Sequence, residues 1–135
     1  MIVLVDTPVW SEFFRRATPQ DPINTALKTL VEGGEGALLG PIRQELLSGV
    51  KDARQFERLR GALRAFPDVT ILSRDYEAGA QMFNRCRAKG IQGSNTDFLI
   101  CAVSIRLSAP IFTFDKDFEA FGLVLPVHLY RPAIG

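Results

Sequence analysis

The chain has 135 residues, of which 47% are hydrophobic and 23% charged, with ten Phe. This length supports one hydrophobic core, and the composition excludes a disordered tail or a low-complexity fibre. Sixteen Lys and Arg against 15 Asp and Glu leave a formal charge of +1. That balance excludes a protein that holds nucleic acid or a membrane by bulk charge alone.

The apolar runs are too short for a signal peptide or a membrane span. The first run stops at Asp6 without a preceding basic stretch, and residues 98–103 form a run of six, against about 20 for a bilayer span. We therefore expect a cytoplasmic protein with no membrane segment. Cys86 and Cys101 lack CxxC spacing and His128 is the single His, so a zinc site is poorly supported and buried free thiols are expected.

The chain begins with a strand and a helix signal. Residues 2–5 form a short apolar run that predicts a buried strand, and the run stops at Asp6. Thr7 can then cap a helix that has Pro8 in its first position. Apolar spacing and Gly or Pro boundaries predict, in chain order, a helix after Pro8, a helix over 22–31 introduced by Asp21, a strand at 37–39, helices at 41–49 and 52–65, a strand or extended connection at 69–72, helices at 73–89 and 94–107, a strand at 111–114, a short helix at 116–121 and a last strand at 127–130.

Strands that alternate with helices of this length imply βαβ crossovers and a mainly parallel sheet. We therefore expect a single α/β domain over residues 1–135, a three-layer α/β/α sandwich with a sheet of about four to five strands. The apolar faces of the 22–31 helix and of Phe56, Leu59 and Leu63 either complete the core or contact a partner.

Two predicted strands run directly into an aspartate. Asp6 and Asp115 are 109 positions apart, but the carboxyl ends of parallel strands share one edge of a sheet, where ligands bind. Further acids lie close to predicted strand or helix ends: Glu45, Asp97 and Asp117. Crowded carboxylates repel one another, and no basic residue lies within eight positions of Asp6. Mg²⁺ or Mn²⁺ would supply the missing charge and could activate water against a phosphodiester.

Each acid also has a purely structural explanation. Asp97 follows Ser94 by three, the spacing of a capping box, and Asp115 and Asp117 can cap the helix at 116–121. Glu45 alone is typical of a solvated helix position. Taken together, in this order on an α/β fold, the acids favour a shared site.

Four segments around these acids resemble the acidic blocks of PIN domains. They are VDTPVW at 5–10, IRQELLSG at 42–49, DFLICAV at 97–103 and TFDKDF at 113–118. In length and block order the whole chain is similar to the small VapC-like toxins of toxin–antitoxin pairs. The resemblance implies a Mg²⁺- or Mn²⁺-dependent endoribonuclease that forms a homodimer. It also implies inhibition by a cognate antitoxin whose tail occupies the active-site groove.

The resemblance also implies roles for individual acids. Asp6 and Asp97 would be the main metal ligands, and Asp115 would complete the site directly or through water. Glu45 would hold a second metal ion or a water molecule. Asp117 shares the Asp-Lys-Asp segment with Asp115, and the sequence leaves open which of the two faces the metal.

Small hydroxyl residues and arginines surround these blocks. Thr7 and Thr113 stand beside acids, where a hydroxyl can orient a carboxylate. Twelve of the 16 basic residues are Arg, which binds phosphate through a bidentate fork. The candidate RNA contacts are Arg85, Arg87, Lys89 and Arg43, with the basic helix at 52–65 either joining them or forming a solvated face. The aromatic residues mostly fall at core spacing, so no base-stacking platform is expected.

Three alternatives compete with a metal-dependent nuclease. A haloacid-dehalogenase-type phosphatase would need a second Asp where this chain has Pro8, and a receiver domain would need an acid adjoining Asp6. A non-catalytic α/β module that binds RNA or protein stays open, since a fold alone does not establish activity.

Overall fold

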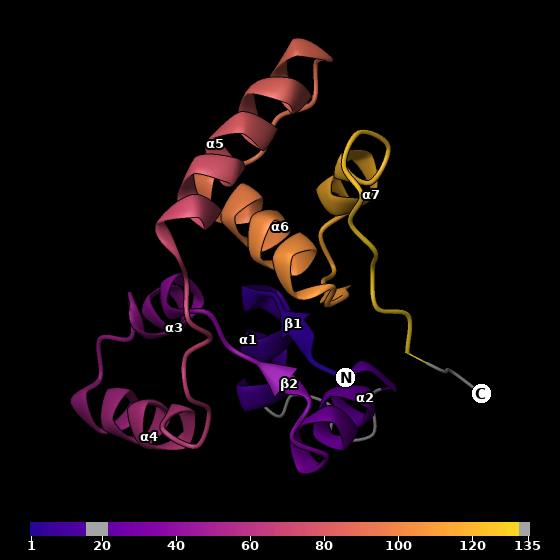
Figure 1. The fold of residues 1–135 in the computed structure, drawn as a ribbon. Helices are drawn as coiled ribbons and strands as arrows, with labels where there is room; N and C mark the ends of the chain where they lie inside the picture. Colours follow the sequence, from indigo (N-terminus) through magenta and orange to yellow (C-terminus); the bar gives the residue numbers. More distant parts are fainter. Residues whose placement is uncertain (16–21, 133–135) are drawn as a thin grey trace.

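The computed structural model describes residues 1–15 and 22–132 (Figure 1). Asp21, the expected cap of the second helix, lies outside these ranges. The elements in chain order are β1 (Val3–Val5), α1 (Thr7–Arg15), α2 (Pro22–Glu32), β2 (Gly36–Ala37), α3 (Gly40–Leu47), α4 (Ala53–Leu63), α5 (Ser73–Ala88), α6 (Asn95–Leu107), β3 (Ile111–Phe112) and α7 (Asp117–Phe121). The predicted helices are all present, within two residues of the expected bounds at most ends.

The sheet is parallel, with the order β2-β1-β3 and β1 at its centre. The expectation of about four to five strands is wrong for the described residues, which form three strands. Residues 69–72 are a connection and not a strand, the second of the two expected alternatives, and one isolated parallel bridge, Leu38 with Asp68, lies just before them. The strand expected at 127–130 is replaced by one isolated parallel bridge, Ile111 with Leu129. Pro67 and Pro126 lie next to these segments, and because proline has no N–H to donate, neither segment can extend the ladder across it.

Helices cover both faces of the sheet, as expected for three layers. In Figure 1, α6 lies on one side of the sheet, with α5 and α7 beyond it. The group formed by α1 to α4 lies on the other side. Gly79 lets α5 and α6 approach closely, because a Cβ there would lie 3.3 Å from the carbonyl oxygen of Phe98. Arg106 of α6 donates to the buried carboxylate of Asp75 at 2.8 Å and also to the carbonyl of Thr70. These contacts fix the direction of α6 and hence the position of its N-terminus.

The core is one continuous cluster of apolar side chains. Every residue of β1 is fully buried, and residues 98–104 of α6 are buried without interruption. The two cysteines are buried and free, which confirms the prediction for them. Within the described ranges, no helix is both long and apolar enough to cross a membrane.

The two apolar helix faces that the sequence assigned either to the core or to a partner contact differ in burial. Leu27 and Leu30 of α2 are buried, so this stripe belongs to the core. On α4, Leu63 is buried while Phe56 and Leu59 are only half-buried. The α4 face therefore keeps apolar surface within reach of a partner.

Candidate active site

Asp6 lies at the carboxyl end of the central strand, in the step from β1 to α1. Its side chain is only 6% exposed. Oδ1 accepts a hydrogen bond from the amide of Thr7 at 2.9 Å, and Oδ2 accepts one from the hydroxyl of Thr113 at 2.8 Å. Both carboxylate oxygens are thus oriented by groups from neighbouring strand ends.

The segment that follows β3 carries the next two acids. The Thr113 hydroxyl, which donates to Asp6, also accepts from the amide of Asp115 at 3.0 Å. Asp115 Oδ1 in turn accepts from the amide of Asp117 at 2.9 Å, where α7 begins. Lys116 occupies the cap position of α7, so the predicted capping by Asp115 or Asp117 is wrong, although Asp115 does accept from the amide of the first helical residue. Its bond to Thr113 links Asp115 to Asp6.

Asp97 reaches the same region from the first turn of α6. Its Oδ2 accepts from the amide of Ser94 at 3.0 Å, and the Ser94 hydroxyl accepts from the amide of Asp97 at 3.1 Å. This is the capping box that the spacing predicted. The cap uses only Oδ2, which leaves Oδ1 available for another partner.

The electrostatics place four of the predicted acids in one neighbourhood. Burial raises the pKa of Asp6 above its ordinary value, and the nearby carboxylates of Asp97 and Asp115 raise it further. Burial likewise raises the pKa of Asp97, with further contributions from Asp115 and Asp117. Among the described residues, none of these carboxylates forms an ion pair. The cluster therefore has an unbalanced negative charge.

Glu45 is joined to this cluster through Thr7. Thr7 is the first residue of α1 and not its cap, so that prediction is wrong. Its hydroxyl donates instead to Glu45 Oε2 at 2.6 Å, across to α3. Hydrogen bonds thus join both predicted hydroxyls to predicted acids, Thr7 to Glu45 and Thr113 to Asp6 and the amide of Asp115, whereas Asp97 bonds only to Ser94 among the described residues.

The acids have the donor chemistry for a hard cation. In residues 1–15 and 22–132, no group of three or more His, Cys, Asp or Glu side chains is arranged to hold a metal ion as it stands. Each carboxylate offers about four lone-pair sites, and the bonds to Asp6 occupy two of them. The neighbouring carboxylates raise the pKa values of Asp6 and Asp97, and a divalent ion would offset that repulsion.

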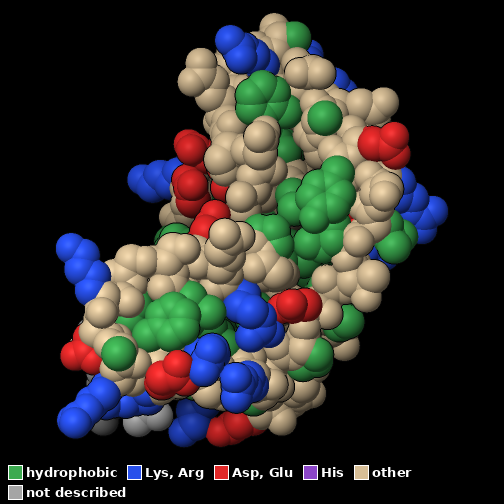
Figure 2. Space-filling view, turned by 90° about the vertical axis from the view of Figure 1, so that its left-hand side faces the viewer, with side chains coloured by type: hydrophobic (Ala, Val, Ile, Leu, Met, Phe, Trp, Pro, Cys, Tyr) green, Lys and Arg blue, Asp and Glu red, His purple; other side chains and the backbone are tan. Residues whose placement is uncertain are grey.

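A cleft of about 900 Å³ opens beside the acids, between α1, α3 and α4. Thr7 and Glu45 lie at its acidic end, and the rest is lined by apolar and polar side chains in similar measure, two arginines among them: Phe14, Leu46, Val50, Leu59, Ser11, Ser48, Gln55, Arg15 and Arg58. Figure 2 shows hydrophobic side chains exposed in the lower half of this face, with Lys and Arg around them and a group of Asp and Glu above. The cleft suits an occupant with both apolar and charged groups.

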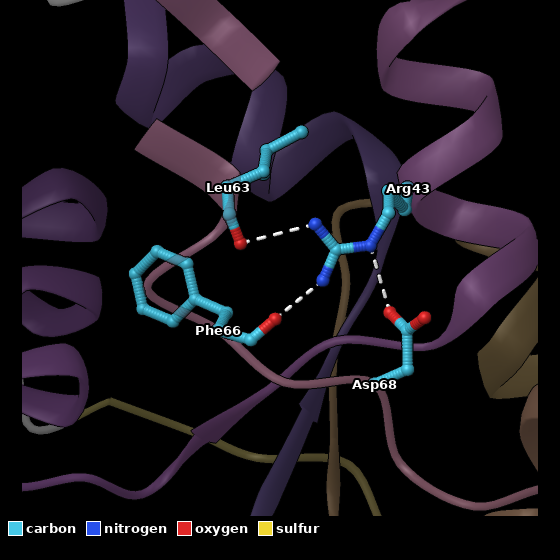
Figure 3. Close-up of polar contacts among 4 residues, drawn as sticks. All are labelled: Arg43, Leu63, Phe66 and Asp68. Atoms are coloured by element: carbon cyan, nitrogen blue, oxygen red, sulfur yellow. Dashed lines mark hydrogen bonds and ion pairs between the residues drawn. The ribbon is translucent and has the colours of Figure 1, made fainter. Parts of the chain in front are cut away.

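Arg43, one of the predicted RNA contacts, forms structural bonds within the fold. Its guanidinium donates to Asp68 Oδ1 at 2.8 Å, to the carbonyl of Leu63 at 3.0 Å and to the carbonyl of Phe66 (Figure 3). These bonds tie α3 to the turn after α4. Since all three guanidinium nitrogens are used, the group is committed to the fold.

The second basic group remains mostly open. Arg85 donates to the carbonyl of Val124 at 3.1 Å, whereas the exposed Arg87 and Lys89 form no ion pair within the described part of the chain. Arg87 also lines a small cavity of about 200 Å³ next to Gly93, which precedes Ser94. This group therefore lies on the approach to Asp97.

Sequence reasoning missed several residues at the site. Ser11 and Arg15 line the cleft from α1, although no motif marked them, and Arg58 lines it from the basic helix that the sequence left open as an RNA contact or a solvated face. Phe114, the last residue of the strand expected at 111–114, lies outside β3 and has a side chain that is 43% exposed.

Comparisons with known proteins agree with this arrangement. A family model described as PIN domain matches residues 3–123. A protein named VapC ribonuclease Mb1587, from Mycobacterium bovis, is 28% identical over 125 residues, which cover 91% of this chain and 93% of that protein. Ribonuclease VapC11 from Mycobacterium tuberculosis has the same identity and coverage.

Solved structures share the fold. FitAcB from Neisseria gonorrhoeae aligns with a TM-score of 0.77 at 20% identity, over 97% of this chain and 98% of that one. VapBC2 from Rickettsia felis, bound to a DNA fragment from its promoter, aligns with a TM-score of 0.74 at 16% identity, over 96% and 98% of the two chains. These likenesses confirm the predicted α/β fold class.

Proposed function

The chain belongs to the PIN domain family, and on that premise we propose that it is a Mg²⁺- or Mn²⁺-dependent endoribonuclease, the toxin of a toxin–antitoxin pair. One observation carries the proposal: Asp6, Asp97 and Asp115 come from three distant segments and lie near one another at one sheet edge. The pKa values of Asp6 and Asp97 are raised, and none of the three carboxylates has a cationic partner in the described residues. The names of the relatives, which are ribonucleases, support the activity.

The donor set of the site fits a hard divalent cation. Asp6 and Asp97 would hold the ion, Asp115 would complete the site, and Glu45 would hold a second ion or a water molecule. Asp117 is an additional candidate, because its charge already acts on Asp97. When bound, such an ion lowers the pKa of a coordinated water and neutralises charge on the phosphate.

The remaining side chains give the acids their orientation. Thr113 fixes Asp6 relative to Asp115, Thr7 fixes Glu45, and the α6 cap fixes Asp97. Because each carboxylate is oriented by a neighbour, little rearrangement would be needed for it to bind a ligand. The burial of Asp6 limits the access of bulk water to the centre of the cluster.

The RNA strand would be held by local arginines, consistent with the near-zero net charge. Arg87 and Lys89 flank the segment that leads to Asp97, and Arg58 and Arg15 lie in the cleft. We propose these side chains, together with Arg85, as phosphate contacts. Arg43 is omitted because its guanidinium is already bonded within the fold.

We also propose an antitoxin as the regulatory partner, since a structurally similar chain, aligned with a TM-score of 0.67 at 19% identity over 97% of this chain and 98% of that one, belongs to a toxin–antitoxin complex from Klebsiella pneumoniae. The antitoxin tail would lie in the cleft between α1, α3 and α4, where apolar side chains lead to Glu45. We further propose a single PIN-like domain over residues 1–135, which the single core cluster supports. We also propose that the protein forms a homodimer and acts on RNA in the cytoplasm.

The activity can be tested with purified protein and an RNA pool. Wild-type protein should cleave RNA with Mg²⁺ or Mn²⁺ and stop with EDTA. Asp97→Asn should be inactive, because Asn keeps the cap but removes the charge. Asp52→Asn is the matched control, since Asp52 also caps a helix, α4, but lies outside the cluster, so it should retain activity.

One outcome would replace the enzyme with the alternative. If folded wild-type protein cleaves no RNA and binds no divalent ion, a non-catalytic module that binds RNA or protein is the better account. Mapping the cleavage ends in total RNA would identify the target.

A further inference from the structure

A small cavity lies between the end of α5 and the start of α6. Its volume is about 200 Å³, and six residues line it: Phe83, Arg87, Ile91, Gln92, Gly93 and Phe98. For comparison, a cavity of about 150 Å³ engineered into another protein holds one benzene molecule. This cavity therefore has room for one planar ring system and not for a longer segment of a partner.

The walls of the cavity combine aromatic rings with two free polar side chains. Phe98 is 1% exposed, so the cavity reaches the core, and Phe83 meets it edge to face with 5.6 Å between the ring centroids. The side chains of Gln92 and Arg87 are exposed and form no hydrogen bond or ion pair with the described residues. The amide of Gln92 offers both donors and an acceptor, and the guanidinium of Arg87 offers donors with a positive charge. This lining suits a flat ligand that has a hydrogen-bonding edge and a nearby anion.

The chain around the cavity carries only positive charge. Residues 78–96 contain no acid and three basic residues, Arg85, Arg87 and Lys89. Arg85 is bonded to the carbonyl of Val124, whereas Arg87 and Lys89 form no ion pair in the described part of the chain. A nucleotide combines the two features that this lining calls for, since its base is flat with a polar edge and its phosphate is an anion. An apolar side chain of a protein partner would fill the cavity but leave both cations unpaired.

The first turn of α6 joins the cavity to the acidic cluster. Because α6 leads into β3, its N-terminus lies at the carboxyl edge of the parallel sheet, where the acids gather. Gly93, in the cavity wall, precedes Ser94, whose amide donates to Asp97 Oδ2 at 3.0 Å. Phe98, also in the wall, follows Asp97 and is turned from it by about 100° around the helix axis. Asp97 thus faces the cluster from the same turn that walls the cavity.

The helix α7 closes the same corner from a different part of the chain. The charge of its first residue, Asp117, acts on Asp97, and Phe121, one turn later, packs on Phe98 with 4.7 Å between the ring centroids. A Cβ on Gly93 would lie 2.5 Å from the ring of Phe121, so the cavity wall rests directly on α7. The elements that carry two of the acids therefore also build or support the cavity.

We propose that this cavity is a pocket for one unstacked nucleobase of single-stranded RNA, from a nucleotide that flanks the cleaved bond. This inference rests on the proposed function. Phe83 and Phe98 would contact the base, Gln92 would hydrogen-bond its edge, and Arg87 would hold its phosphate. Because the cavity holds a single ring system, the pocket would select the base at one position of the RNA.

The base preference of cleavage tests the pocket. A pool of single-stranded RNA of random sequence is cut to a low extent in Mg²⁺, and the bases on each side of the cut are counted by sequencing. Wild-type protein should prefer one base at one position near the cut. Gln92→Ala should lower this discrimination by about 5-fold to 150-fold, the range for one bidentate contact to a base. Gln81→Ala is the matched control, because Gln81 is also exposed and lines another surface cavity on α5, and it should keep the preference.

Binding separates the role of Gln92 from that of Arg87. In an Asp6→Asn background, which leaves the first turn of α6 intact, short RNAs are titrated in Mg²⁺ buffer and followed by fluorescence anisotropy. An abasic nucleotide at the preferred position should weaken binding to the parent and have little further effect on Gln92→Ala. Arg87→Gln should weaken the binding of all sequences alike and reduce its salt dependence, as expected for a phosphate contact.

Three results would overturn the inference. If wild type cleaves with no base preference near the cut, or if Gln92→Ala keeps that preference, the cavity does not read a base, although the proposed ribonuclease stands. If Gln92→Ala changes the oligomeric state in size-exclusion chromatography and leaves RNA binding unchanged, the cavity receives a side chain from a second copy of the chain. If wild-type protein neither binds nor cleaves RNA, the inference fails together with the proposed function. Both side chains are exposed, so thermal melts of the variants should match wild type.

Discussion

The hydroxyl of Thr113 joins two acids, and its removal should be costly. Thr113→Val keeps the shape of the side chain but deletes the donor to Asp6 Oδ2, at 2.8 Å, and the acceptor for the amide of Asp115, at 3.0 Å. A hydrogen bond to a charged group contributes about 1.5–3 kcal/mol, and the 6% exposure of Asp6 leaves water little room to replace it. We therefore expect Thr113→Val to lower the free energy of unfolding by about 2–3 kcal/mol at pH 7.

The same bond gives a pH dependence with a definite sign. The Thr113 hydroxyl favours the ionised form of Asp6, so without it the pKa of Asp6, already raised from 3.8 by burial, rises further. The deficit of Thr113→Val should be full at neutral pH and should shrink as the pH falls through the folded-state pKa of Asp6, where the carboxylate becomes protonated.

Urea denaturation in EDTA, followed by circular dichroism at several pH values, measures both effects. Thr113→Ser is the control, because it keeps the hydroxyl. The Val variant should also bind Mg²⁺ about tenfold more weakly than the Ser variant, since Thr113 orients a proposed ligand. Equal unfolding free energies for Val and Ser at pH 7 would refute the reasoning about this hydrogen bond.

Three further predictions concern the cluster and its supports. Without metal, Asp6→Asn should be neutral or stabilising in a thermal melt, because burial and neighbouring carboxylates disfavour the charge of Asp6. Mg²⁺ should raise the melting temperature of wild type and not that of the variant. A strongly destabilised variant would point to a purely structural carboxylate. Arg106→Met should cost about 3 kcal/mol in urea denaturation, because it leaves the carboxylate of Asp75 buried without its partner, and an unchanged midpoint would contradict that role. Gly93→Ala should cost about 1–3 kcal/mol, because its Cβ would lie 2.5 Å from the ring of Phe121, and a melt equal to that of wild type would show that the loop adjusts freely.

The local signals in the sequence predicted the helices and the position of the acids well. Caps, prolines and apolar spacing are determined by nearby residues, so the capping box of Ser94 and Asp97 was visible before the structure. The meeting of Asp6 and Asp115 was also predictable, because it follows from the topology of a parallel sheet.

Features that depend on long-range pairing were not predictable. Arg43 looked like an RNA contact because nothing local shows that Asp68 and two carbonyls after α4 lie beside it. The segments outside the three strands form only single bridges, because pairing across a sheet depends on the partner strand. β3, which pairs with Leu129, is itself only two residues long.

The overall charge of +1 hides a separation of charge. Four aspartates and Glu45 gather at one sheet edge, while Arg15, Arg58, Arg87 and Lys89 lie on the surrounding helices and turns. One or two bound divalent ions would offset much of the acidic charge and leave the surface around the site positive. A near-neutral total is therefore compatible with RNA binding by local charge.

Cleavage of one end-labelled single-stranded RNA, measured against Mg²⁺ concentration for wild type and Asp6→Asn, tests the central claim most directly. The acidic cluster predicts that wild-type cleavage rises with Mg²⁺ to saturation and disappears in EDTA, and that folded Asp6→Asn is inactive at every Mg²⁺ concentration. Cleavage that persists in EDTA, or that survives in Asp6→Asn, would contradict it.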